Sequence, residues 1–168
     1  AAAYYFVRNY IPGAEFASTI PTGQVIAAAP ITEAPNHFIY LIGDGMGYNH
    51  WAKTKQERGI DLTVETFDYM GNSMTRSISD AVTDSAAGGT ALSCGIRTYN
   101  SGVGVYLLDP LDVFIHPINI TELCCDNKML TGVITTDETS GATPASFSAH
   151  ATERYKSEDI TEDQFKSG

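Results

Sequence analysis

The chain has 168 residues, of which 20 are acidic and 10 are basic, so its net charge at pH 7 is −10. Apolar residues make up 43% of the chain, which is typical of a globular protein and argues against disorder. The acidity argues against non-specific binding to DNA, RNA or an anionic membrane, and no apolar run approaches the ~20 residues of a transmembrane helix.

The first part of the chain differs in composition from the rest. Residues 1–36 are rich in proline and alanine and keep no apolar period, so we interpret them as an N-terminal arm. An unbroken apolar run from Phe38 to Ile42 then predicts a strand buried on both faces, as in a parallel sheet. We therefore expect the folded domain over residues 37–168. The chain starts with alanine, which leaves a removed signal and a start within a longer chain as alternatives.

Helices and strands are predicted to alternate along this domain. Helices are expected over 48–58, 85–93, 119–129 and 143–152, the last with Thr143 as its N-cap and Pro144 at its first position. Further strands are expected over 72–79 and 132–136, and a polar, acidic tail over 153–168. This order predicts an α/β fold, a mainly parallel sheet flanked by helices. Ligands of such sheets bind beyond the carboxyl ends of the strands.

Asp44 follows the first predicted strand, within Ile42-Gly-Asp-Gly-Met-Gly47. A carboxylate at a strand end, between small residues, is a good ligand for a metal ion. An Asp-Gly pair is also typical of a turn, so this motif alone leaves both interpretations open.

Ser85 is expected in the first turn of a helix, within Thr83-Asp-Ser-Ala-Ala-Gly-Gly-Thr-Ala91. The backbone N–H groups at a helix N-terminus attract phosphate and would stabilise a serine alkoxide. None of the four histidines falls into a recognisable triad pattern, so a metal ion bound through Asp44 is a reasonable way to activate the serine. The alternative is that Asp84 or Ser85 only caps the helix.

Arg154 and Thr143 are weaker candidates by themselves. The guanidinium of Arg154 could hold two phosphate oxygens, or it could be an ordinary surface group at a helix C-terminus. The hydroxyl of Thr143 could bind a hard metal ion, or it could serve only as a helix cap.

Together and in this order, these segments resemble the alkaline phosphatase family. The resemblance covers about residues 37–168 and rests on the stretches 42–47, 83–91, 95–100, 135–136, 142–145, 149–150 and on Arg154. It implies an enzyme that hydrolyses phosphate monoesters through a phosphoserine, with two zinc ions and usually a magnesium ion.

The resemblance also implies a role for each matching residue. Ser85 would be the nucleophile and a zinc ligand. Arg154 would bind the phosphate, and Asp84 would orient that arginine. Asp44 would bridge a zinc ion and the magnesium ion, and Thr143 would bind the magnesium. Small phosphate monoesters as substrates, a possible homodimer and a secreted or periplasmic location are further expectations from the resemblance.

The sequence departs from the family pattern in two ways. Gly141 stands where many relatives carry Asp or His, close to the third metal ion, so we expect an altered magnesium site. Most zinc ligands of the family lie beyond the equivalent of Gly168, and a catalytic zinc ion usually needs three protein ligands. We therefore expect the N-terminal part of an alkaline phosphatase, with an incomplete sheet, inactive without the remaining part of the enzyme.

Two functions other than that of an alkaline phosphatase are possible alternatives. A phosphodiesterase, sulfatase or phosphonate hydrolase of the same superfamily is disfavoured, because sulfatases need a C/S-x-P-x-R setting that is absent here and nucleotide phosphodiesterases typically use a threonine in a different local sequence. The second reading is a non-catalytic phosphate- or metal-binding module, which would keep Ser85 and Arg154 but form no phosphoserine.

Overall fold

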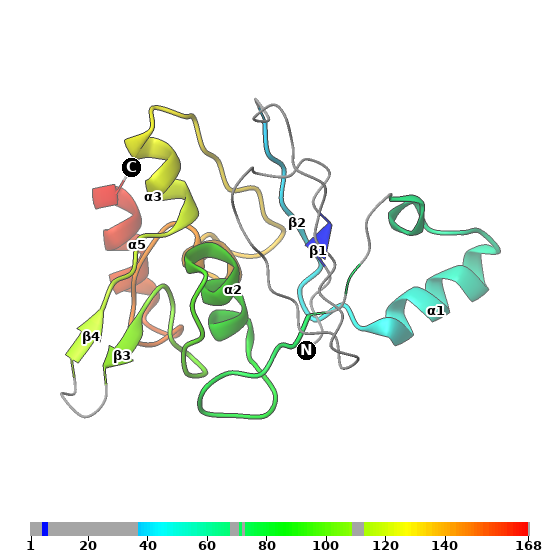
Figure 1. The fold of residues 1–168 in the computed structure, drawn as a ribbon, viewed down its shortest axis with the longest axis horizontal. Helices are drawn as coiled ribbons and strands as arrows, with labels where there is room; N and C mark the ends of the chain where they lie inside the picture. The colour runs from blue at the N-terminus through cyan, green and yellow to red at the C-terminus, as the bar shows by residue number, and fades with distance from the viewer. Residues whose placement is uncertain (1–4, 7–36, 68–70, 72, 109–112, 168) are drawn as a thin grey trace. The chain divides into compact units, whose positions relative to one another are not determined.

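The computed structural model describes residues 5–6, 37–67, 71, 73–108 and 113–167, and Figure 1 shows its ribbon. The chain divides into two compact units, one up to Met74 and the other from Thr75. Apart from Tyr5–Phe6, the predicted arm lies outside the described residues. The boundary that we place after residue 36 therefore stays a prediction.

In its described residues, the unit up to Met74 contains two short strands, one helix and one 3-10 turn. These are β1 (Tyr5–Phe6), β2 (Leu41–Ile42), α1 (Tyr48–Arg58) and η1 (Thr63–Thr66). β1 and β2 pair antiparallel, with Tyr5 opposite Ile42. The strand expected over 38–42 is thus shorter than predicted and has an antiparallel neighbour. It is not buried on both faces either, because Ile39 and Leu41 are 73% and 58% exposed.

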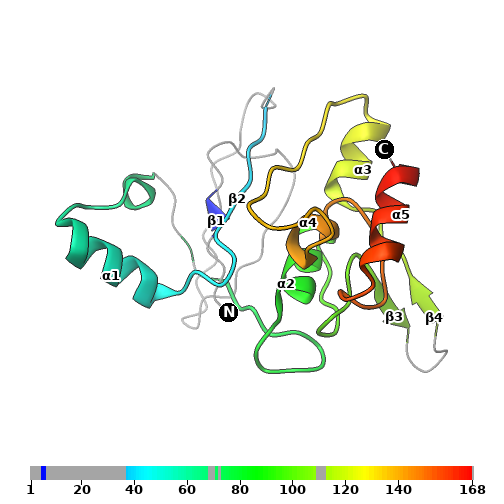
Figure 2. The ribbon, with the colours of Figure 1, turned by 180° about the vertical axis from the view of Figure 1, so that it is seen from behind.

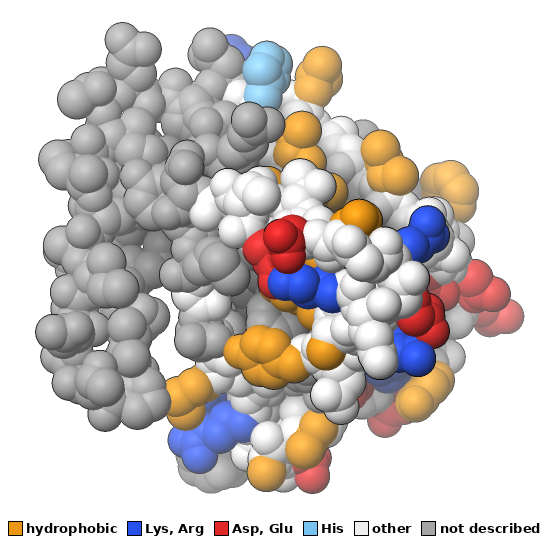
Figure 3. All heavy atoms as spheres, turned by 90° about the vertical axis from the view of Figure 1, so that its right-hand side faces the viewer, with side chains coloured by type: hydrophobic (Ala, Val, Ile, Leu, Met, Phe, Trp, Pro, Cys, Tyr) orange, Lys and Arg blue, Asp and Glu red, His pale blue; other side chains and the backbone are white. Residues whose placement is uncertain are grey.

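Helix α1 agrees with its predicted span. Gly59 ends it in the left-handed conformation, at φ 63°, and its N–H donates to the Lys55 carbonyl. The Lys55 ammonium group binds the Glu65 carboxylate at 2.9 Å and the Asp61 carboxylate at 3.1 Å. In Figure 3, acidic and basic side chains lie beside one another on the face that carries α1.

The unit from Thr75 consists of helices and one hairpin in its described residues. Its elements are α2 (Ser85–Cys94), β3 (Tyr106–Leu108), β4 (Val113–Ile115), α3 (Ile120–Asp126), α4 (Ala142–Ser146) and α5 (Ser157–Ser167). Helices α2 and α4 pack against each other, as Figure 2 shows. Small apolar side chains form the core of this unit: Ala86, Val103, Ala142, Ala145, Ala149, Ala151 and Ile160. None of the helices in the described ranges is long and apolar enough to cross a bilayer.

The mainly parallel sheet is not seen in the part of the chain that the structure describes. Residues 73–79 and 132–136 form no strand, and the strands that do form pair antiparallel. A parallel strand is held by hydrogen bonds to neighbouring strands. No such neighbour for these two segments is among the described residues, and the side chains of Met74 and Ile134 remain 71% and 101% exposed.

Three helix predictions need correction. Asn119 is the N-cap of α3 rather than its first residue, and this helix ends at Asp126. Gly141, not Thr143, is the N-cap of α4, and that helix stops at Ser146 because the chain then turns to pair Ala151 with Val103. The predicted polar tail contains helix α5, whose apolar periodicity is too weak to be recognised although Ile160 is fully buried.

Candidate active site

The N-terminus of α2 carries the two residues that the sequence singled out there. Asp84 is the N-cap, and its Oδ1 accepts a hydrogen bond of 2.9 Å from the Ala87 N–H. Ser85 is the first residue of the helix and is half-buried. The prediction that Ser85 lies in the first turn of a helix is therefore confirmed, and the capping role of Asp84 is real as well.

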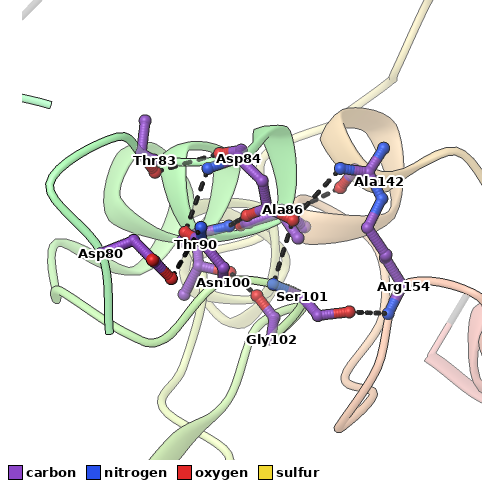
Figure 4. A network of polar contacts seen from close by, with 12 residues as sticks. Asp80, Thr83, Asp84, Ala86, Thr90, Asn100, Ser101, Gly102, Ala142 and Arg154 are labelled. Carbon is purple, nitrogen blue, oxygen red and sulfur yellow. Dashed lines mark hydrogen bonds and ion pairs between the residues drawn. The ribbon is translucent and has the colours of Figure 1, made fainter. Parts of the chain in front are cut away.

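The second carboxylate oxygen of Asp84 ties this helix end to Arg154. Asp84 Oδ2 accepts a hydrogen bond of 3.1 Å from Arg154 Nη1 and one of 3.0 Å from the Ser101 N–H (Figure 4). The two side chains of this ion pair are 27% and 23% exposed, so solvent reaches them only in part. A charge-assisted contact of this kind fixes the guanidinium beside the first turn of α2.

Asn100 and Ser101 support this arrangement, although the sequence assigned them no role. The Asp84 N–H donates to Asn100 Oδ1 at 3.1 Å, and Asn100 Nδ2 donates to the Val82 carbonyl at 3.1 Å. Ser101 has a positive φ of 80°, which aims its N–H at Asp84. The sequence signal for Asn100 was that it ends the stretch 95–100, which resembles the family, whereas Ser101 lies just outside that stretch.

Thr143 reaches α2 because that helix has glycine at the contact. A Cβ at Gly89 would lie 2.6 Å from Ser146 Oγ and 3.5 Å from Thr143 Cα. Ser146 is fully buried, and its hydroxyl donates to the Ala142 carbonyl at 2.7 Å. The close approach of α4 to α2 therefore places half-buried Thr143 against the helix that Ser85 begins.

The space beside Gly141 holds the carboxylate of Asp137. A Cβ at position 141 would lie 2.1 Å from Asp137 Oδ2 and 2.9 Å from the Glu138 carbonyl oxygen. Asp137 itself is exposed, and its Oδ1 accepts a hydrogen bond from the Glu138 N–H at 2.8 Å. Glycine at position 141, two residues before Thr143, thus leaves room for the carboxylate of Asp137.

Asp44 lies in the other unit, in the turn that follows β2. The Met46 N–H donates to the Gly43 carbonyl at 3.2 Å, and Gly45 has a φ of 66°. The turn interpretation of the Asp-Gly pair is thus confirmed. It does not exclude a metal-binding role, because the two interpretations use different atoms of Asp44.

The donor atoms fit magnesium better than zinc. Within the described ranges, no group of three or more His, Cys, Asp and Glu residues could hold a metal ion. A catalytic zinc ion needs about three such ligands, so these residues do not fit two zinc ions by themselves. Magnesium keeps several waters and binds through one or two carboxylates, so a single carboxylate such as that of Asp44 is a suitable ligand for it.

Sequence comparison identifies relatives of this chain. The family model described as alkaline phosphatase matches residues 36–167. An alkaline phosphatase of Schizosaccharomyces pombe is 38% identical over 143 residues, which cover 81% of this chain and 26% of that protein. An alkaline phosphatase of Escherichia coli is 35% identical over 146 residues, which cover 79% of this chain and 30% of that protein.

Solved structures give the same result. The alkaline phosphatase from the Antarctic bacterium TAB5 is 43% identical, with a TM-score of 0.50 over 55% of this chain and 25% of that one. The cold-active enzyme of a psychrophilic Shewanella species is 29% identical, with a TM-score of 0.59 over 74% of this chain and 32% of that one. A variant of the TAB5 enzyme, with a histidine replaced by glutamate, has magnesium bound in its M3 site. The present chain belongs to the alkaline phosphatase family and spans about a quarter of the length of the relatives that it matches.

Proposed function

We propose that the protein containing this chain hydrolyses phosphate monoesters through a phosphoserine at Ser85. The observation that carries the proposal is the ion pair between Arg154 and Asp84, the residue directly before Ser85. This pair holds a cation at the helix end where a serine hydroxyl and backbone N–H groups already favour an anion. A phosphoryl group bound there would meet a nucleophile and positive charge together.

The proposed reaction has two steps. In the first, the Ser85 oxygen forms a bond to phosphorus as the bond from phosphorus to the ester oxygen breaks, and the alcohol leaves with a proton. In the second, water attacks phosphorus, the bond to Ser85 breaks, a proton from the water returns to the Ser85 oxygen, and inorganic phosphate is released. Arg154 binds the phosphoryl oxygens in both steps, and Asp84 keeps the guanidinium in place.

The proposal includes two zinc ions and one magnesium ion. Such ions, when bound, favour the ionised serine and stabilise the leaving oxygen. Asp44, Ser85 and Thr143 are the ligands that this chain would supply, and Gly141 supplies none. The remaining zinc ligands would come from the rest of the enzyme. Small phosphate monoesters as substrates, a homodimer and a secreted or periplasmic location belong to the same proposal.

Trapping the covalent intermediate tests the proposal. The intact protein is incubated with a radiolabelled phosphate monoester, quenched in acid and digested, and the labelled peptide is sequenced. We expect label on Ser85 and expect S85A to lose both the label and turnover. S93A is the matched control, because Ser93 lies at the other end of α2. Full activity of S85A, or label on another residue, would contradict the mechanism.

A non-catalytic phosphate- or metal-binding module is the second candidate. It would use the same helix end and the same ion pair between Arg154 and Asp84, without a covalent step at Ser85. This candidate predicts that the intact protein binds inorganic phosphate saturably and that R154A weakens this binding. It also predicts that Ser85 never carries label. The labelling experiment therefore separates the two functions.

A further inference from the structure

His150 joins three parts of the unit from Thr75. It lies in the segment between α4 and α5, four residues before Arg154. Its Nε2 is 3.0 Å from Glu122 Oε1 on α3, and its Nδ1 contacts the Gly104 carbonyl oxygen. The side chain is only 11% exposed. Because each ring nitrogen of this largely buried side chain has a hydrogen-bond partner, His150 links segments that are far apart in the sequence.

Both partners of the ring are acceptors. The Gly104 carbonyl oxygen faces Nδ1 of the ring, and a Glu122 carboxylate oxygen faces Nε2. Burial by itself raises the pKa of Glu122, but hydrogen bonds from the Asn119 N–H and from His150 outweigh it, and its pKa lies below the usual range. The exposed His116 ring stacks on His150 at a centroid distance of 5.1 Å.

The backbone around His150 is fixed as well. The His150 N–H donates to Asp163 Oδ2 on α5 at 2.7 Å. The next residue, Ala151, exchanges two hydrogen bonds with Val103, of 2.9 Å and 2.8 Å. Further along, the Tyr99 hydroxyl donates to the Thr152 carbonyl at 2.7 Å. These contacts hold residues 150–152 against the turn that precedes β3.

The contact between Gly104 and His150 requires a glycine at position 104. Its φ is 58°, and a Cβ there would lie 2.8 Å from His150 Nδ1 and 2.6 Å from the Ala149 carbonyl oxygen. Its N–H donates to Thr90 Oγ1 on α2 at 2.8 Å. The same turn contains Ser101, whose N–H donates to Asp84 Oδ2. The turn therefore connects His150 to the N-terminus of α2, where Arg154 binds.

We propose that His150 is a positioning residue for Arg154. Through its contacts with both Glu122 and Gly104, it fixes the segment that brings the guanidinium to Asp84 and to a bound phosphoryl group. The inference deepens the proposed function and rests on it, because it takes Arg154 as the residue that binds phosphate.

A double-mutant cycle in the intact protein tests the inference. Affinity for inorganic phosphate is measured for the wild type, H150A, R154A and the double variant. We expect H150A to weaken binding about tenfold in the wild-type background and less than about twofold in the R154A background, since residues that act through one another are not additive. Equal losses in both backgrounds would overturn the inference, because they would show an effect unrelated to Arg154.

Two further variants separate positioning from general damage to the fold. In E122Q, the amide group can still form a hydrogen bond with the ring, so His150 keeps both contacts, and we expect phosphate affinity within about twofold of the wild type. In E122A that partner is lost, and we expect a weakening similar to H150A. His116→Gln is the control, because the ring of His116 touches His150 only by stacking in the described part of the chain. If E122Q weakened phosphate binding as much as E122A does, the inference would be overturned.

Hydrogen exchange keeps this test independent of the proposed function. In H150A we expect faster amide exchange at residues 149–154 and unchanged exchange in α2. Unchanged exchange at 149–154 would overturn the inference, whatever the phosphate affinity. If R154A itself binds phosphate normally, the proposed function fails instead, and the exchange data still decide whether His150 holds this segment.

Discussion

Asp84 uses its two carboxylate oxygens for different purposes. Oδ1 caps α2 through the Ala87 N–H, and Oδ2 receives Arg154 and the Ser101 N–H. Capping requires only an acceptor, which asparagine also provides. Binding a guanidinium and a second N–H donor at the other atom requires an oxygen there. The two functions of Asp84 can therefore be separated by one substitution.

We expect D84N to weaken phosphate binding by about tenfold, because hydrogen bonds to charged groups contribute about 1.5–3 kcal/mol and the amide group offers only one oxygen. Isothermal titration of the intact protein with inorganic phosphate measures this loss. D80N is the matched control. Asp80 belongs to the same network, through Ser79 and Asn100, but has no contact with Arg154 among the described residues. Unchanged affinity in D84N would contradict the role given to the Arg154 ion pair.

At the scale of elements, helices and their ends, which depend on neighbouring residues, were predictable from the sequence. Strand pairing and side-chain contacts between distant segments were not. Helix α1 and its glycine stop follow from local signals, as do Asp84 and Gly95 at the two ends of α2. The strands predicted over 72–79 and 132–136 do not form in the described residues 73–79 and 132–136, because a strand exists only beside a partner strand. The contacts of Asp84 with Ser101 and of His150 with Glu122 join residues of different segments, and no local period announces them.

The packing of α2 on α4 gives a prediction about two adjacent glycines. A Cβ at Gly89 would lie 2.6 Å from Ser146 Oγ and 3.0 Å from Ser146 Cβ, whereas a Cβ at Gly88 would meet nothing closer than 3.8 Å. We expect G89A to lower the free energy of unfolding by about 1–3 kcal/mol through overpacking. We expect G88A to raise it by up to ~1 kcal/mol, because alanine favours a helix more than glycine does.

Urea denaturation of both variants measures this difference. The two substitutions add the same methyl group to the same helix, so helix propensity affects both equally, and the close contact with α4 is what distinguishes them. Because Thr143 lies on α4 beside this contact, G89A should also weaken any magnesium binding more than G88A does. Equal stability of the two variants would show that α4 does not pack against α2 as closely as described.

At the scale of the whole molecule, apolar side chains remain exposed in the segments with strand character. Ile39, Leu41 and Ile134 are 73%, 58% and 101% exposed. Single exposed apolar residues are ordinary, but these lie where the sequence predicted strands of a sheet. The chain spans 26% of the length of its Schizosaccharomyces pombe relative, and we propose that segments equivalent to the rest of that relative would cover these side chains.

The metal content follows from the same argument. Two catalytic zinc ions need about six protein ligands, and the part of the chain that the structure describes offers no group of three. We therefore expect the 168-residue chain, expressed alone, to retain less than one zinc ion per molecule after dialysis and to lack phosphatase activity. The intact protein should retain two, lose activity with a chelator and regain it with zinc. Elemental analysis of both samples measures the zinc, and circular dichroism checks that the short chain is folded. Two retained zinc ions in the folded 168-residue chain would show that its own residues complete the metal sites, and the proposed dependence on the rest of the enzyme would be wrong.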